Sequence, residues 1–330
     1  MKNTLSILLI LTIVALAPAA AQQAQLSGPV SGFIFDSEAQ AIRPIIGIPG
    51  ASYIGDALIA DLDLAAVAPN GKMALALRRG DLLLIRTLDA AAPAPQLVRE
   101  GLGKPDQIVW NSDSSAAALY TSANAAVQIC RNLDATPTMD EPLDLSRLPG
   151  PLTALALPAS ARFVLGGVGG DAGGIYLAPA DGTPARFLTP LNRPVALALA
   201  RGDRDVFAAD GASGEILEIR RYEDAPEIVT FASAGPGLED LVGLALAADE
   251  KTLFVASRSA KEVAAYSTAS PGEALRMPLD FEPSFMQPVK AGSLFLLSTG
   301  SPGKRPFLVL DAGQAPAVYF VPAGAAREEK

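Results

Sequence analysis

Short apolar runs recur along this chain, and each run stops at a cluster of Gly, Pro, Asp or Ser residues. The clearest unit begins at Leu241. It contains apolar runs at 242–246, 252–256 and 262–266 and a weaker run at 274–277. Such short runs between turn residues are typical of β-strands, because helices usually need about ten or more uninterrupted residues. The unit therefore predicts four antiparallel strands joined by hairpins.

The same order of strands recurs between residues 62 and 323, at a spacing of roughly 42 to 47 residues. About six complete units fit into this range. A single hairpin precedes them, Val30–Asp36 followed by Ile42–Ile46, and it resembles the third and fourth strands of a unit. Several first strands are rich in alanine, as in Leu152–Leu157, where small residues alternate with larger ones. Small side chains suit strands that crowd around a common axis.

Two segments carry a resemblance to a known family: LALAADEKTLFVA at 244–256 and VAPNGK at 67–72. The second is close to the SPDGK turn between the first and second strands of that family. The chain thus resembles the β-propeller superfamily, most closely the bacterial YVTN-type and lactonase-like repeats. The resemblance implies an all-β ring of four-stranded antiparallel blades. We expect seven blades, with the N-terminal hairpin as an incomplete blade that closes the ring beside the C-terminal one; six blades plus an appended hairpin is the alternative.

The first residues have the features of a secretory signal peptide, with Lys2, an apolar stretch and a small-residue site that predicts cleavage between Ala21 and Gln22. The apolar stretch is about a dozen residues, shorter than the roughly 20 of a membrane-spanning helix. We therefore expect a secreted or periplasmic protein that does not insert into the membrane after cleavage. The expected organisation is a signal peptide, a short linker, one propeller domain and a disordered tail (1–21, 22–28, 29–323 and 324–330).

Composition restricts the chemistry. The chain has 330 residues, no histidine and one cysteine, Cys130. These counts exclude a Ser-His-Asp triad, a histidine-ligated metal and an intramolecular disulfide. A net charge of −9 argues against a basic surface for nucleic acid. We expect Cys130 to be a buried core residue.

Acidic residues are the remaining candidates for chemistry. One group lies just before first strands, where a propeller opens onto its central channel, and could form an acidic ring for a divalent cation such as calcium or for a polar ligand: Asp61, Asp63, Asp106 and Asp240. A second group falls within one short segment: Asp203, Asp205 and Asp210. The alternatives are solvated surface for the first group and an ordinary Asp-Gly turn for the second.

Two further features have structural explanations. The glycine-rich segment Gly166–Gly174 precedes a strand and has no Gly-Lys-Ser/Thr, so we expect a hairpin loop there and not a phosphate site. Trp110 and Tyr120 fall on the first and second strands of one unit, and we expect both in the core.

Together these features favour an exported, monomeric, non-catalytic recognition or scaffold protein without a cofactor. Its expected partner is a protein or polymer of the cell envelope, bound through loops at one face of the propeller. The alternative is a lactonase-like or other metal-assisted hydrolase that uses Asp and Glu carboxylates at the central channel. Convergent carboxylates at a channel mouth would favour the hydrolase, and a bare channel with exposed apolar residues would favour the scaffold.

Overall fold

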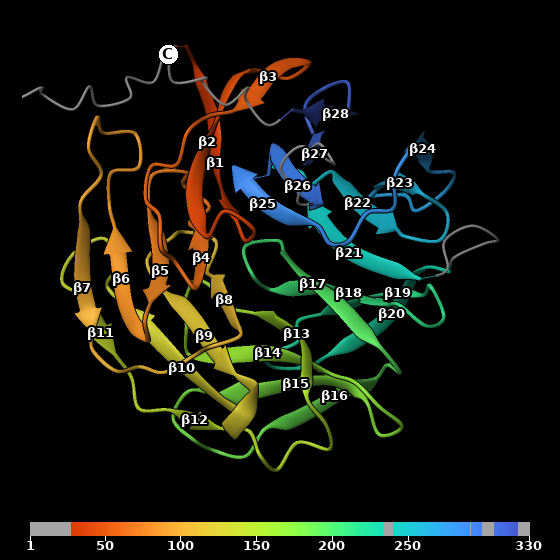
Figure 1. The fold of residues 1–330 in the computed structure, drawn as a ribbon. Helices are drawn as coiled ribbons and strands as arrows, with labels where there is room; N and C mark the ends of the chain where they lie inside the picture. The colour runs from red at the N-terminus through yellow and green to blue at the C-terminus, as the bar shows by residue number, and fades with distance from the viewer. Residues whose placement is uncertain (1–27, 234–239, 291, 299–306, 323–330) are drawn as a thin grey trace, which may run out of the picture.

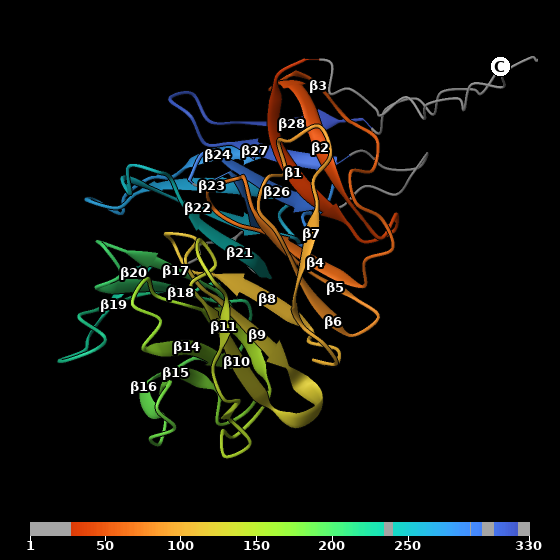
Figure 2. The ribbon, with the colours of Figure 1, turned by 90° about the vertical axis from the view of Figure 1, so that its left-hand side faces the viewer.

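The computed structural model describes residues 28–233, 240–290, 292–298 and 307–322. These residues form seven antiparallel sheets that stand around a central axis as blades (Figures 1 and 2). Within the same ranges the only helix is the short 3-10 helix η1 (Ser122–Asn124), and no helix there could cross a membrane. The predicted all-β propeller with seven blades is confirmed. The predicted signal peptide (1–21), nearly all of the linker (22–28) and the tail (324–330) lie outside the described residues.

The first three blades follow one another along the chain. Blade 1 consists of β1 (Val30–Asp36), β2 (Ala41–Ile48) and β3 (Ala51–Ile54). Blade 2 consists of β4 (Leu64–Val67), β5 (Ala74–Arg78), β6 (Asp81–Ile85) and β7 (Pro95–Arg99). Blade 3 consists of β8 (Gln107–Trp110), β9 (Ala117–Thr121) and β10 (Ala126–Arg131), with an outer strand in two pieces, β11 (Thr138–Met139) and β12 (Leu143–Asp144), which both pair with β10.

The remaining four blades each have four strands. Blade 4 consists of β13 (Leu152–Ala156), β14 (Phe163–Val168), β15 (Gly174–Pro179) and β16 (Arg186–Pro190). Blade 5 consists of β17 (Pro194–Ala200), β18 (Asp205–Asp210), β19 (Ile216–Arg220) and β20 (Glu227–Ala232). Blade 6 consists of β21 (Leu241–Leu246), β22 (Thr252–Ser257), β23 (Glu262–Ser267) and β24 (Leu275–Pro278). Blade 7 consists of β25 (Gln287–Lys290), β26 (Leu294–Ser298), β27 (Phe307–Asp311) and β28 (Ala317–Val321).

Apolar residues run almost without interruption along the middle strands because both faces of a blade are buried. On β22, Leu253 and Val255 pack toward blade 5, where Phe207 lies. The intervening Phe254 packs toward blade 7 against Phe295. Side chains alternate between the two faces of a strand, so neighbouring residues belong to the two different interfaces between blades. Cys130, which is fully buried, belongs to such an interface, as expected.

Blade 1 is incomplete, as predicted, but its strands take the second, third and fourth positions. A backbone hydrogen bond from Leu62 to Gln40 (2.9 Å) places the β1–β2 turn beside the start of β4, so β1 and β4 run in opposite directions. Second strands run opposite to first strands in a meandering blade. The assignment of the hairpin to the third and fourth strands is therefore wrong by one position. The sequence did not reveal β3, which is only four residues long and completes the outer side.

The ring closes by packing between two separate sheets. Ile45 and Ile54 of blade 1 lie in one buried cluster with Val309 and Val321 of blade 7. A backbone hydrogen bond joins the Ile54 N–H to the Pro322 carbonyl (2.9 Å). No strand of blade 1 is paired in the same sheet as a strand of blade 7 among the described residues.

Strands near the axis approach one another closely, and glycine marks one such place. A Cβ atom on Gly243 of β21 would lie 2.5 Å from the Cβ of Met286 and 2.7 Å from its backbone nitrogen. Met286 leads into β25 of the next blade. The absence of a side chain at position 243 therefore sets the distance between blades 6 and 7.

The glycine-rich segment of blade 4 is only partly a loop. The predicted hairpin turn is present between β14 and β15, but Gly166 and Gly167 lie within β14. A Cβ atom on Gly166 would lie 2.6 Å from Leu152, and one on Gly167 would lie 2.6 Å from Pro194. Strand β14 has glycine at these two positions because the neighbouring inner strands, β13 and β17, leave no room for a side chain.

Candidate functional site

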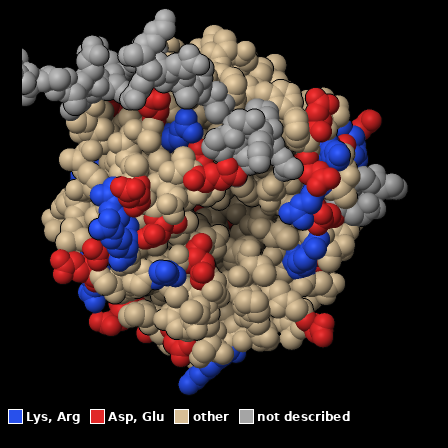
Figure 3. All heavy atoms as spheres, in the orientation of Figure 1, with Lys and Arg blue, Asp and Glu red and all other residues tan. Residues whose placement is uncertain are grey.

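A channel of about 510 Å³ runs along the axis and touches the strand nearest the axis in each blade. Figure 3 shows the hollow at its opening, with acidic side chains beside it on two sides. The strands around it are β1, β4, β8, β13, β17, β21 and β25. We take this channel as the candidate functional site, because it is the place where all seven blades meet.

The walls of the channel are mainly apolar. On β17 the five residues Val195–Leu199 are all half-buried and all line the channel. Trp110, the only tryptophan of the chain, also lines it, and its indole N–H donates to the Ala66 carbonyl (3.0 Å). The expectation of two core aromatics thus holds for the buried Tyr120, whereas Trp110 is half-buried and faces the channel. Partly exposed apolar walls are suited to binding other apolar groups.

Blade 1 presents a strand edge to this channel. Phe35 pairs with Ile42, whose N–H and carbonyl are both bonded to the segment Leu58–Ile59. Phe33 pairs with Pro44, which has no N–H and whose carbonyl accepts from Gly55. Both are therefore non-hydrogen-bonded pairs of the antiparallel ladder, and the main-chain groups of Phe33 and Phe35 point away from β2 toward the axis. No first strand covers this edge in the described residues.

Asp63 and Asp106 precede the inner strands β4 and β8, and each binds a turn of its own blade. Asp63 Oδ2 accepts from the backbone N–H of Arg79 (2.6 Å), and Asp106 Oδ2 accepts from that of Ser122 (2.5 Å). Hydrogen bonds from the Ser122 side chain and backbone lower the pKa of Asp106. In both blades the carboxylate ties the start of the first strand to the turn after the second.

The other two residues of the predicted ring differ from this pattern. Asp240 forms ion pairs with Arg193 (2.9 Å) and Arg258 (3.4 Å) before β21. Asp61 is exposed and has a positive φ of 58°. Of the four, only Asp106 lines the channel. Within the described ranges, no three acidic or cysteine residues come close enough to hold a metal ion together.

The second acidic group is divided between the two ends of β18, about 16 Å apart at 3.3 Å per residue. At one end, Asp203 accepts from the Ala159 N–H (2.6 Å) and Asp205 pairs with Arg201 (2.7 Å). At the other end, Asp210 is buried and accepts from several backbone N–H groups, including those of Asn192 (3.0 Å) and Ala212 (2.8 Å). Each carboxylate organises a local turn or joins two blades.

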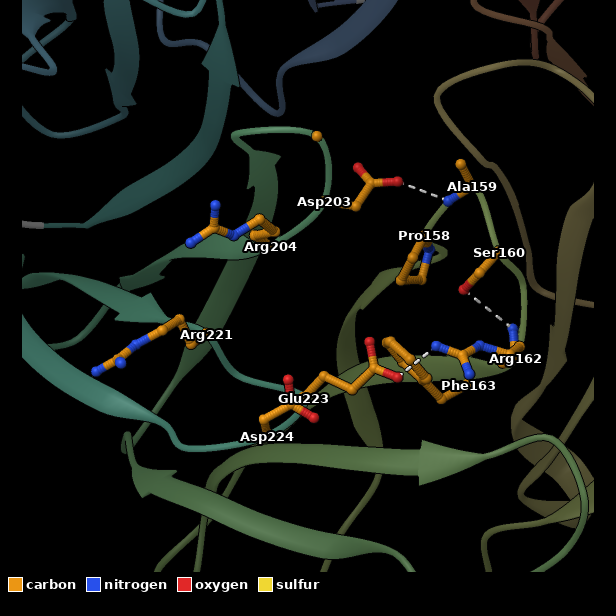
Figure 4. A pocket seen from close by; sticks show the side chains of 11 residues that line it. Pro158, Ala159, Ser160, Arg162, Phe163, Asp203, Arg204, Arg221, Glu223 and Asp224 are labelled. Carbon is orange, nitrogen blue, oxygen red and sulfur yellow. Dashed lines mark hydrogen bonds and ion pairs between the residues drawn. The ribbon is translucent and has the colours of Figure 1, made fainter.

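A second, smaller cavity of about 220 Å³ lies between loops of blades 4 and 5 (Figure 4). Asp203 and the ion pair of Arg162 with Glu223 (2.5 Å) border it. Figure 4 shows that the side chains of Arg204 and Arg221 extend away from these carboxylates. The polar groups here connect loops, and they do not converge on a common point.

Sequence reasoning missed the buried Glu218 of β19. Its carboxylate lies 2.8 Å from Arg220 and 3.1 Å from Arg201. Hydrogen bonding and charge from Glu218 raise the pKa of Arg220. The only signal in the sequence is a glutamate within the apolar run 216–219, which is a weak indication of a buried ion pair.

Neither a protein-family model nor a curated protein sequence matches this chain. Solved structures do match its fold. A functionally unknown protein from Desulfotomaculum acetoxidans DSM 771 is 12% identical with a TM-score of 0.63, covering 88% of this chain and 99% of that one. The fold is a seven-bladed β-propeller. At such low identity, the likeness shows the fold alone.

Two further structures share this propeller fold. A putative 6-phosphogluconolactonase from Bacteroides fragilis NCTC 9343 is 12% identical with a TM-score of 0.58, covering 88% of this chain and 97% of that one. A chain of a nidogen/laminin complex is 13% identical with a TM-score of 0.52, covering 76% of this chain and 93% of that one. One of these neighbours is described as an enzyme and the other as part of a protein complex, so the propeller fold by itself does not choose between the two functions.

Proposed function

We propose that this protein is an exported, non-catalytic propeller that recognises a protein or polymer of the cell envelope. The observation that carries the proposal is the use of the carboxylates. The acidic residues predicted as a site either bind backbone N–H groups of turns, as in Asp63 and Asp106, or form ion pairs, as in Asp240. The channel that they flank has mainly apolar walls. Such a surface favours binding over hydrolysis.

One pair of exposed aromatic rings also supports recognition of a macromolecule, because exposed apolar groups mark a protein-binding surface when they gather into a patch. Other exposed apolar side chains of the outer strands lie on three different blades: Leu97, Phe187 and Leu275. Phe320 makes an edge-to-face contact with the exposed Phe281, at 5.5 Å between ring centroids.

The propeller acts as a monomer without a cofactor, and it binds no nucleic acid. Export follows from the predicted signal peptide, which is removed between Ala21 and Gln22 and leaves no membrane anchor. The acidic net charge and the lack of histidine agree with this proposal.

A metal-assisted, lactonase-like hydrolase is the second candidate, because the propeller resembles a putative 6-phosphogluconolactonase. In this case Asp106 would be the residue to test, since it lines the channel and its lowered pKa keeps it ionised. Its carboxylate would bind a divalent cation that activates water.

One set of experiments separates the two functions. The protein starting at Gln22 is used to capture components of the envelope of its own source, with Val195→Ser in the channel wall and the exposed Asp171→Ser as test and control variants. A component retained by the wild type and by the control, but not by the folded Val195→Ser variant, is the expected result. Lactone hydrolysis that needs a divalent cation and is lost in the folded Asp106→Asn variant would overturn the proposal.

A further inference from the structure

The described part of blade 1 lacks the strand that lies nearest the axis in every other blade. The second strand, β1, therefore takes its place at the channel wall, between β4 of blade 2 and β25 of blade 7. On the face of β1 toward blade 7 the packing is close, because a Cβ on Gly32 would lie only 2.4 Å from Val289 of β25. The edge of β1 at Phe33 and Phe35 borders the channel.

The main-chain groups of Phe33 and Phe35 that face the axis have no partner in the sheet, as shown above. Phe33 is also 96% buried, with only 4% of its surface exposed. Buried backbone N–H and carbonyl groups are nearly always paired in folded proteins. An unpaired strand edge at the wall of an apolar channel is therefore a site where an added strand would gain hydrogen bonds and bury apolar surface.

We propose that an extended peptide segment of a partner protein enters the channel and pairs with β1 at Phe33 and Phe35, along the edge of β1 that faces the axis. The proposal rests on the recognition function above and names its ligand class. The segment would be rich in small apolar residues, because several of the inner strands in other blades are so, as in β4 (LAAV) and β17 (PVALALA).

The length of the chain before β1 favours a partner over this chain's own N-terminus. In the other six blades, the connection between the first and second strands takes three to six residues, for example 291–293 and 68–73. The predicted mature chain has only eight residues, 22–29, before β1 begins at Val30. After a connection of three residues, the remaining five would reach only as far as residue 34 of β1, so they could not pair with both Phe33 and Phe35.

A synthetic peptide that copies β17, with two lysines added for solubility, tests the proposal on the protein that starts at Gln22. We expect the peptide to bind and to slow amide hydrogen exchange at Phe33 and Phe35. A peptide of the same sequence with alternate backbone nitrogens methylated is the matched control, since it cannot donate hydrogen bonds along one edge. It should bind at least about tenfold more weakly.

Substitution at Phe35 gives a second, independent test. Proline removes the N–H that faces the channel, and proline is tolerated on a strand edge where the N–H is unpaired. The Phe35→Pro variant should therefore fold and lose peptide binding about tenfold, whereas Phe35→Leu should retain it. If Phe35→Pro does not fold, the exchange rates in the wild type still decide the matter.

Two outcomes would overturn the proposal. Equal binding of the plain and methylated peptides, without protection of Phe33 and Phe35, would exclude strand addition. Protection of both amides in the free protein that disappears on deletion of 22–27 would show that this chain's own segment occupies the edge. Failure of the recognition function is distinguishable, because lactone hydrolysis and metal content are measured without the peptide.

Discussion

Replacing Gly243 by alanine tests whether the distance between blades 6 and 7 is set by the backbone of β21. The new Cβ would lie 2.5 Å from the Cβ of Met286 and 2.7 Å from its nitrogen, whereas ordinary contacts begin at 3.4 Å. The strands must therefore move apart by about 0.9 Å at this point. The obstacle includes backbone atoms of the neighbouring blade, so a change of side-chain rotamer cannot relieve it.

Overpacking of this kind costs about 1–3 kcal/mol of unfolding free energy. At roughly 2 °C per kcal/mol for a domain of this size, Tm should fall by about 2–6 °C. Thermal unfolding followed by circular dichroism, together with urea denaturation, measures both quantities. Gly272→Ala is the matched control, because its Cβ would meet nothing closer than 3.9 Å and its φ is not positive. A Gly243→Ala variant as stable as this control would refute the reasoning.

Three other predictions follow from the structure. Burial raises the pKa of the Cys130 thiol from 9.0 to about 12, so thiol reagents should label it only after unfolding. The stabilisation that the neutral thiol gives is complete below pH 9 and falls by about 1.4 kcal/mol per pH unit between pH 9 and 12. Over this window the unfolding free energy of Cys130→Ala should therefore decline less steeply with pH than that of the wild type. Equal slopes for the two proteins would contradict the linkage. Asp210→Ala should lower the unfolding free energy by about 3 kcal/mol, because buried N–H groups lose a charged acceptor, whereas the exposed Asp171→Ala should change it by less than about 0.5 kcal/mol; urea denaturation of both checks this. The exported protein should begin at Gln22 on N-terminal sequencing, and a chain that retains residues 1–21 would contradict cleavage after Ala21.

The strands of complete blades could be predicted because turn residues and apolar runs agree there. In blade 6 the runs 242–246 and 252–256 correspond to β21 and β22 within a residue at each end. The position of a hairpin within a blade could not be predicted, since a second and a third strand show the same pattern of apolar and turn residues. The N-terminal hairpin was misplaced for this reason, and only the contact of its turn with the start of β4 decides it.

The candidate site was predictable only in part. The sequence placed Asp63, Asp106 and Asp240 before first strands, and the structure agrees with this position. It could not show that two of these carboxylates bind turns, because the geometry of a turn depends on the folded blade. Nor could it separate channel-facing from blade-facing residues, since the half-buried run of β17 has apolar residues on both faces.

The closure of the ring has a consequence for the order of folding. Each blade is built from consecutive residues, so its strands can pair as soon as that segment of chain is available. The interface between blades 1 and 7 is different, because Ile54 and Pro322 must meet across nearly the whole chain. Closing so long a loop carries the largest entropic penalty of any contact in the ring. We therefore expect this interface to form last during folding and to be the first to open when the propeller begins to unfold.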